Sequence, residues 1–212
     1  MTSSAEEVME INPLYKYRPD ADRYAGLLLK EHELDSHPII KKNAERSYSS
    51  GSAIGAHYLN ERLAPNWIPP TTEPLYDNAP KEGDFPSLSN YWSLPIFSEK
   101  AWRALKSMIE QDCEALPIVH YSGEPYFIIH LLRETDAIDL GRSAATYSPV
   151  TKRARTIFQY TFKRENLVGR HLFRVSLQCG GGTFVSEEFR ERVMKHKLKG
   201  LLFEPLPLAA GS

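Results

Sequence analysis

Two segments of this sequence begin in the same way, with an apolar residue, a serine and a glutamate, at 97–99 and at 185–187. A serine at a helix start accepts a hydrogen bond from a first-turn N–H group, and a glutamate beside it suits the helix dipole. Apolar residues then recur at spacings of three and four, which predicts two short amphipathic helices. The residues expected to face inward are Ala101, Trp102, Leu105, Met108 and Ile109 in the first helix and Phe189, Val193 and Met194 in the second.

Most of the other apolar residues lie in short runs that are typical of β-strands. The runs 116–121 and 126–132 are separated by Ser-Gly-Glu-Pro, which predicts a hairpin. The runs 157–162 and 172–177 alternate apolar and polar residues, as half-buried strands do. We therefore expect an α+β fold: a mixed, mainly antiparallel sheet with two capped amphipathic helices. Further strands are expected at 24–29, 183–185 and 201–203.

The N-terminal part of the chain is rich in turn residues, and residues 65–86 carry six of the 15 prolines. Proline fixes φ and lacks a backbone donor, so this stretch should be extended or turning. It also holds Trp67 and Tyr76, which a disordered linker does not need. We expect a proline-rich arm laid against the body of the protein. The predicted organisation is a loop-rich region at 1–82, an α+β domain at 83–205 and a tail at 206–212.

Charge is distributed unevenly along the chain, whose net charge is −1. Residues 151–212 hold 12 Lys+Arg and 5 Asp+Glu, a net of +7. The rest of the chain holds 26 − 12 = 14 basic and 27 − 5 = 22 acidic residues, a net of −8. Such polarity either steers a partner of complementary charge or holds two parts of one fold together. The nearly neutral total argues against a protein that coats nucleic acid.

The expected location is the cytoplasm, without membrane contact. The first 19 residues include three glutamates and no apolar run of signal-peptide length. Cys113 and Cys179 are the only cysteines, too few for a secreted disulfide scaffold, although the sequence leaves open whether they pair. His120 and His130 lie on opposite strands of the expected hairpin, but zinc sites need three or four ligands. We expect neither a metal nor another cofactor.

Recognisable catalytic motifs are absent: there is no nucleophile elbow, zinc-protease helix, paired-cysteine motif or phosphate-binding loop. Asp136 and Asp139 would share one face if their segment were helical, as a metal-dependent hydrolase would require. The alternative is that one of them caps a turn and pairs with Arg133 or Arg142. A second rival is a nucleic-acid-binding regulator, in which Phe158 and neighbouring aromatics alternate with the basic C-terminal residues. A half-buried strand accounts for that alternation through its period of two alone, and we favour this interpretation.

Seven short stretches carry a resemblance to a known family, in the same order along the chain. They are 83–87 (GDFPS), 94–101 (LPIFSEKA), 116–118 (LPI), 135–139 (TDAID, with Ser143 after it), 173–174 (FR), 184–189 (FVSEEF) and 198–203 (LKGLLF). These stretches resemble a bacterial immunity-protein family of polymorphic toxin systems, the myxobacterial-type immunity domain, formerly a domain of unknown function. The similarity extends from Gly83 to Pro205.

The resemblance implies a non-enzymatic protein that binds and neutralises a cognate toxin encoded by an adjacent gene. The resemblance assigns no catalytic residues to this chain. Tight neutralisation needs a few aromatic or arginine anchors, which loops on a rigid scaffold can present. Acidic residues would match a basic toxin surface. The predicted partner-binding residues are Trp67, Tyr76, Glu82, Asp84, Tyr91, Trp92, Asp136, Asp139 and Arg142.

Overall fold

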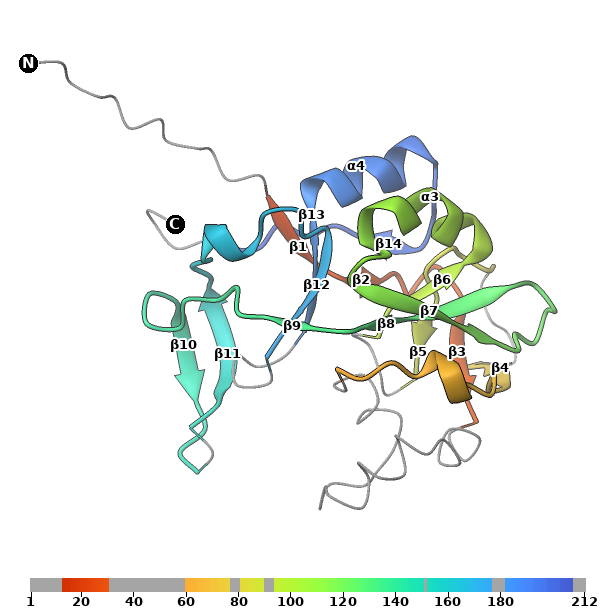
Figure 1. Ribbon diagram of the computed structural model, residues 1–212, viewed down its shortest axis with the longest axis horizontal. Helices are drawn as coiled ribbons and strands as arrows, with labels where there is room; N and C mark the ends of the chain where they lie inside the picture. Colours follow the sequence, from red (N-terminus) through yellow and green to blue (C-terminus); the bar gives the residue numbers. More distant parts are fainter. Residues whose placement is uncertain are drawn as a thin grey trace, which may run out of the picture.

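The computed structural model describes residues 13–30, 60–76, 81–89, 94–150, 152–176 and 182–207. These residues form two α-helices, two 3-10 helices and five small sheets, and both α-helices lie on the same side of the strands (Figure 1). The helices are α3 (Glu99–Ile109), α4 (Glu187–Lys195), η2 (Ala64–Asn66) and η3 (Arg164–Asn166). The strands are β1 (Leu14–Lys16), β2 (Arg18–Pro19), β3 (Gly26–Leu29), β4 (Thr72–Pro74), β5 (Ser87–Leu88), β6 (Ile96–Ser98), β7 (Cys113–Ile118), β8 (Tyr126–Leu131), β9 (Glu134–Thr135), β10 (Ala144–Tyr147), β11 (Ala154–Gln159), β12 (Leu172–Val175), β13 (Thr183–Ser186) and β14 (Leu201–Leu202).

Both predicted helices are confirmed, with their serine caps. The Ser98 hydroxyl accepts from the Ala101 N–H at 3.1 Å, and the Ser186 hydroxyl accepts from the Phe189 N–H at 3.2 Å. The prediction for Met194 is wrong, because its side chain is 61% exposed. Met194 follows the buried Val193 and is therefore turned about 100° away around the helix, since 3.6 residues complete one turn.

The predicted hairpin is also confirmed. Strands β7 and β8 pair antiparallel, with Leu116 opposite Ile128, and β6 pairs with the other edge of β8. The sheet order β6-β8-β7 places the strand that precedes α3 directly beside the hairpin. This sheet packs on the sheet β4-β3-β5 through shared buried leucines and isoleucines.

The four-stranded sheet has the order β1-β13-β12-β9. It therefore places a strand from near the start of the described chain beside one from near its end. β1 pairs antiparallel with β13, and β2 pairs antiparallel with β14. Only β12 with β9 and β3 with β5 pair in parallel among the described strands. The α+β class with mainly antiparallel sheets is therefore confirmed.

Strand β12 differs from the expected half-buried pattern, because all four of its residues are buried. Leu172 belongs to the core beneath the helices, whereas Phe173 and Val175 belong to a different cluster, on the opposite face of the strand. A strand between two neighbours and covered on both faces has no solvent side, so the prediction of half burial is wrong. Arg174 is buried within this strand.

Three clusters of buried side chains form the core. The helix core joins α3, α4 and several strands through the rings of Tyr17, Phe85, Phe97 and Phe189. The second cluster lies between the two three-stranded sheets and includes Leu63 of the N-terminal part, with Trp67 packed against it. The third cluster stacks Tyr160, Phe162, Phe173 and Phe184 beside the base of the β10–β11 hairpin.

Candidate functional site

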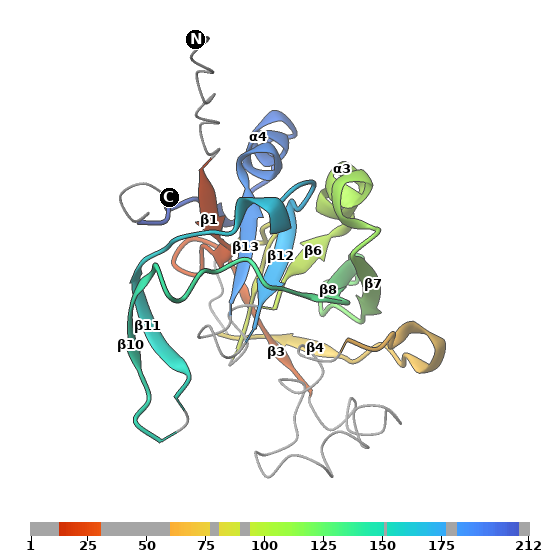
Figure 2. The same cartoon turned by 60° about the vertical axis from the view of Figure 1, so that its left-hand side comes forward.

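The structure places the predicted partner-binding residues at two separate parts of the molecule. Trp67, Tyr76, Glu82 and Asp84 belong to segments around β4 and β5, whereas the range 136–142 connects β9 to β10. Figure 1 shows β4 and β5 on one side of the molecule and the β10–β11 hairpin on the other, and Figure 2 shows the same separation for β4. Tyr91 and Trp92 lie outside the described residues. The described candidates therefore do not form one contiguous site.

Trp67 attaches the N-terminal segment to the body. Its indole N–H donates to the Pro117 carbonyl at 2.7 Å, and its ring packs against the second core cluster. The neighbouring backbone continues this attachment, because the Thr72 N–H donates to the Val119 carbonyl at 2.9 Å. Tyr76, by contrast, is 65% exposed. Of these two aromatic residues, only Tyr76 presents most of its ring to solvent.

Asp84 joins three segments of the chain. One carboxylate oxygen accepts from the Ser98 hydroxyl at 2.7 Å, and the other accepts from the Lys199 N–H at 2.8 Å. Its backbone bonds the same two residues, accepting from the Ser98 N–H and donating to the Lys199 carbonyl. Asp84 therefore connects the cap of α3 to the segment that follows α4. Both oxygens of its carboxylate therefore already accept hydrogen bonds within the fold.

Glu82 lies beside a cluster of aromatic rings at the β7–β8 turn. The His120 ring stacks on Tyr126, with 4.3 Å between the ring centroids, and its other ring contact is Tyr121. Burial lowers the pKa of His120, against the opposing effect of Glu82. Burial raises the pKa of Tyr121, and the Glu82 carboxylate raises it further. Glu82 itself is exposed, so an acidic group borders this aromatic cluster at the surface.

Asp139 shapes the turn that leads into the β10–β11 hairpin. Its carboxylate accepts from the Gly141 N–H at 3.0 Å and from the Arg142 N–H at 3.2 Å. This is the Asx arrangement expected of an aspartate in a turn. The Arg142 side chain is exposed just beyond it. The segment is not helical, so the shared helical face that a hydrolase would need does not form.

Asp136 makes an ion pair with Lys163 at 2.7 Å, which is neither of the arginines considered from the sequence. Its side chain is 73% exposed. Two other members of the basic C-terminal part have internal acceptors: Arg170 pairs with Asp112, and Arg174 donates to Asn60. The basic residues are thus divided between the interior and several parts of the surface.

A charged cluster is buried beneath residues 60–63. Glu114 and His130 face each other across the β7–β8 pair, and the Glu114 carboxylate accepts from the Leu63 N–H. His130 Nε2 lies 3.0 Å from the Glu61 carbonyl. Burial lowers the pKa of His130. Sequence reasoning found His130 but missed its charged surroundings, because Glu114 and Arg174 come from different strands.

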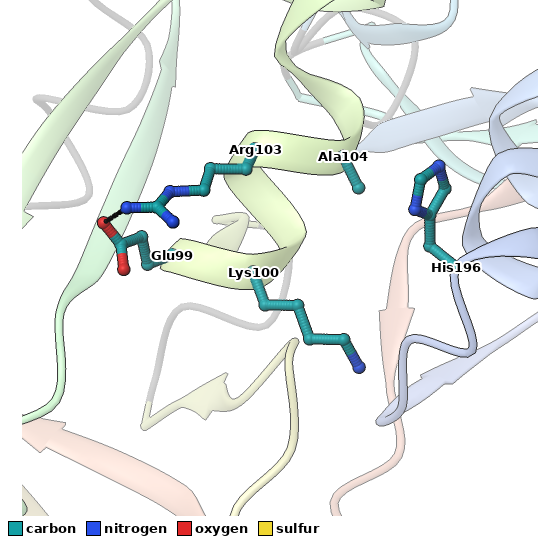
Figure 3. A pocket seen from close by; sticks show the side chains of 5 residues that line it. All are labelled: Glu99, Lys100, Arg103, Ala104 and His196. Atoms are coloured by element: carbon teal, nitrogen blue, oxygen red, sulfur yellow. Dashed lines mark hydrogen bonds and ion pairs between the residues drawn. The ribbon is translucent and has the colours of Figure 1, made fainter.

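A pocket of about 320 Å³ lies between α3 and the end of α4 (Figure 3). In the figure, Arg103 is directed away from His196 and toward Glu99, with which it forms an ion pair of 2.7 Å. Lys100 and His196 complete the polar part of the lining. Cys113 lies elsewhere, as a buried free thiol with a pKa raised by burial to about 12. Cys179 lies outside the described residues.

Within the described ranges, no group of three or more histidine, cysteine, aspartate or glutamate residues is placed to hold a metal ion. None of the described helices is long and apolar enough to cross a membrane. Most of the carboxylates among the predicted partner-binding residues, namely those of Asp84, Asp136 and Asp139, already have hydrogen-bond or ion-pair partners within the protein.

Comparison with known proteins gives one family. Residues 116–207 match the model of an immunity protein family (Imm11). This range runs from β7 to just beyond β14, and it includes the β10–β11 hairpin and α4. The resemblance to a bacterial immunity-protein family is confirmed, and the match supports an immunity role. No curated protein matches the chain.

Proposed function

We propose that this protein neutralises a cognate bacterial toxin, encoded by an adjacent gene, by binding it rather than by catalysis, and that it does so in the cytoplasm. The match of residues 116–207 to an immunity protein family is the observation that carries this proposal. Binding of this kind requires a rigid scaffold that presents exposed anchors. The helix core and the confirmed sheets supply the scaffold.

The surroundings of the two aspartates favour binding over hydrolysis. A metal-dependent hydrolase needs carboxylates that are available to the ion. Here the Asp139 carboxylate accepts two backbone N–H groups, and the Asp136 carboxylate lies 2.7 Å from the Lys163 ammonium. Both carboxylates therefore have roles in the fold or at its surface that do not require a metal.

The predicted partner-binding residues divide into two groups under this proposal. Trp67, Asp84 and Asp139 act as supports, because each bonds another segment or turn of the body. The remaining residues are proposed to contact the toxin. They are Tyr76, Glu82, Asp136 and Arg142, together with Tyr91 and Trp92 from the sequence.

The test is a growth rescue combined with a pull-down. Cells that express the toxin encoded next to this gene are supplied with the full chain, and an unrelated immunity protein serves as the control. We expect growth only with this chain, and co-purification with a catalytically inactive form of the toxin. If soluble, folded protein neither rescues growth nor captures the toxin, the proposal is wrong. Metal-dependent hydrolysis by the purified chain, lost on Asp136→Asn, would instead favour an enzyme.

A further inference from the structure

The β10–β11 hairpin stands apart from the other sheets. Its two strands pair only with each other in the sheet topology, and both views show it extending away from the body (Figures 1 and 2). An isolated two-stranded hairpin is at best marginally stable in water. Its conformation therefore depends on how its base is attached.

The base of the hairpin is held by a set of hydrogen bonds around Asp139. The Ser143 hydroxyl donates to the Asp139 carbonyl at 2.7 Å and accepts from the Thr161 N–H at 3.0 Å. The Thr161 hydroxyl donates to the Arg142 carbonyl at 3.0 Å. Directly beyond, Tyr160 and Phe162 are buried in the third core cluster. The hairpin is thus anchored at one end and exposed at the other.

Three large apolar side chains on the hairpin face solvent. Tyr147 is 45% exposed, Phe158 is 56% exposed, and Val150 at the tip is 86% exposed. The register explains the position of Phe158. The β10 partners in β11 are residues 159, 157, 156 and 154, so Arg155 and Phe158 are the two residues that the pairing skips. Such bulges redirect a side chain out of the ladder, and here they affect one aromatic residue and one cation.

The hairpin and its flanks carry charge of a single sign. Residues 140–164 contain six Lys or Arg residues and no Asp or Glu. Lys152, at the tip, has a φ of 58°, a conformation that favours glycine, yet the sequence has a charged side chain there. Lys152 and Arg155 are both exposed. A surface of this sign is complementary to a carboxylate-rich partner.

We propose that the β10–β11 hairpin is the docking element for an acidic face of the toxin. Phe158 acts as the apolar anchor, and Arg155 and Lys152 pair with carboxylates around it. Aromatic residues and arginine are the types that dominate binding energy at interfaces. This inference rests on the proposed immunity function and names one surface through which that function acts.

A protein partner fits the hairpin better than a nucleic acid does. Single-stranded nucleic acid binds along several successive aromatic rings beside cations. In this chain the run of aromatics that continues from Phe158 turns inward, because Tyr160 and Phe162 are buried. On β11 itself Phe158 and Arg155 are exposed, and one aromatic residue and one cation on the same strand suit a local contact with a protein surface.

The test compares two matched double variants of the full chain. The hairpin variant is Phe158→Ala with Arg155→Ala, and the control is Met194→Ala with Lys195→Ala on α4. Each pair removes one exposed apolar side chain and one exposed cation. The probe is the catalytically inactive toxin encoded next to this gene. We expect the hairpin variant to bind about 30-fold or more weakly, as loss of a central anchor predicts, and the control to bind like the wild type.

A charge-reversal variant tests the sign of the partner surface without removing packed groups. Lys152→Glu with Arg155→Glu should slow association and abolish growth rescue, with an unchanged circular dichroism spectrum. Raising the salt from about 50 to about 300 mM should slow association of the wild type as well, because ions screen exposed charges. This variant also decides the outcome if the Phe158→Ala variant fails to fold.

The outcomes separate the inference from the proposed function. Rescue by the wild type together with undiminished toxin binding by both hairpin variants would overturn the inference and leave the immunity function standing. Failure of the wild type to bind would overturn both. A hairpin-dependent mobility shift of a short single-stranded RNA, with toxin affinity unchanged, would assign the hairpin to nucleic acid and refute an acidic protein partner.

Discussion

A carboxylate that accepts backbone N–H groups fixes the path of the chain around it. Asp139 does so for two N–H groups where the chain turns into β10, and Asp84 does so for the Lys199 N–H while also accepting the Ser98 hydroxyl. Bonds of this kind hold nearby exposed residues in place. At the scale of single residues, these aspartates support the surfaces beside them.

We expect Asp139→Ala to lower the free energy of unfolding by about 0.5–2 kcal/mol, because two backbone donors lose their acceptor, as in the loss of a helix cap. Asp136→Ala is the matched control, and it should cost less than about 1 kcal/mol, since its ion pair with Lys163 is largely exposed. Urea denaturation of both variants measures the difference. Equal midpoints for the two variants would contradict the turn role of Asp139.

Each α-helix is joined to the rest of the protein through its capping serine. Besides accepting the Ala101 N–H, Ser98 donates to Asp84, and Ser186 shares a hydrogen bond with His171 Nδ1 at 3.0 Å. The serine that begins each helix therefore also fixes its position against another segment. At the scale of elements, local capping and tertiary attachment use the same hydroxyl.

Ser186→Ala should lower the free energy of unfolding by roughly 1 kcal/mol through the lost cap. Ser98→Ala should cost more, because the half-buried Asp84 carboxylate also loses a charge-assisted hydrogen bond. Ser107→Ala, at an exposed position of α3, is the control and should be neutral or slightly stabilising. Guanidinium denaturation gives the three values. If Ser98→Ala and Ser107→Ala have the same midpoint, the cap of α3 contributes nothing.

Packing at the scale of the whole molecule brings together titratable and charged groups that are far apart in the chain. Glu114, His130 and Arg174 come from β7, β8 and β12, and residues 60–63 contact this group through Asn60 and the backbone of Glu61 and Leu63. Charged groups are rarely this deeply buried without partners. The cluster therefore attaches the N-terminal segment to the sheets by polar contacts, beside the apolar contacts of Leu63.

The burial of His130 predicts a loss of stability in acid. Its folded pKa lies below the ordinary value of 6.5, so the unfolded chain binds the proton first as the pH falls. Stability is therefore fully present above about pH 6.5 and declines below it, by at most about 1.4 kcal/mol per pH unit for one histidine. His120 contributes in the same direction.

The free energy of unfolding, measured by urea titration between about pH 7.5 and 5.5, should fall less steeply in His130→Gln than in the wild type. Glutamine retains a donor for the Glu61 carbonyl but does not titrate. His196→Gln, at an exposed position at the end of α4, is the matched control for the replacement of an imidazole by an amide. An unchanged slope in His130→Gln would show that this histidine is not buried in its neutral form.

Local patterns in the sequence determined the helix starts, the β7–β8 hairpin and the α+β class, because capping, period and turn chemistry act over a few residues. Tertiary structure alone decided which faces those elements cover. The clearest case is the strand β12, whose sequence alternates although the strand is covered on both sides. Burial depends on neighbours brought from distant parts of the chain, and a local pattern does not specify them.

The same distinction holds for the surfaces. Composition showed that residues 140–164 are basic, and alternation predicted that Phe158, Tyr160 and Phe162 lie on a strand. Only the fold separated Phe158 from the other two rings. The bulge at Phe158 leaves that ring in solvent. Tyr160 and Phe162 are buried in the third core cluster. Register and packing are set by contacts between segments, and those contacts form only when the whole chain folds.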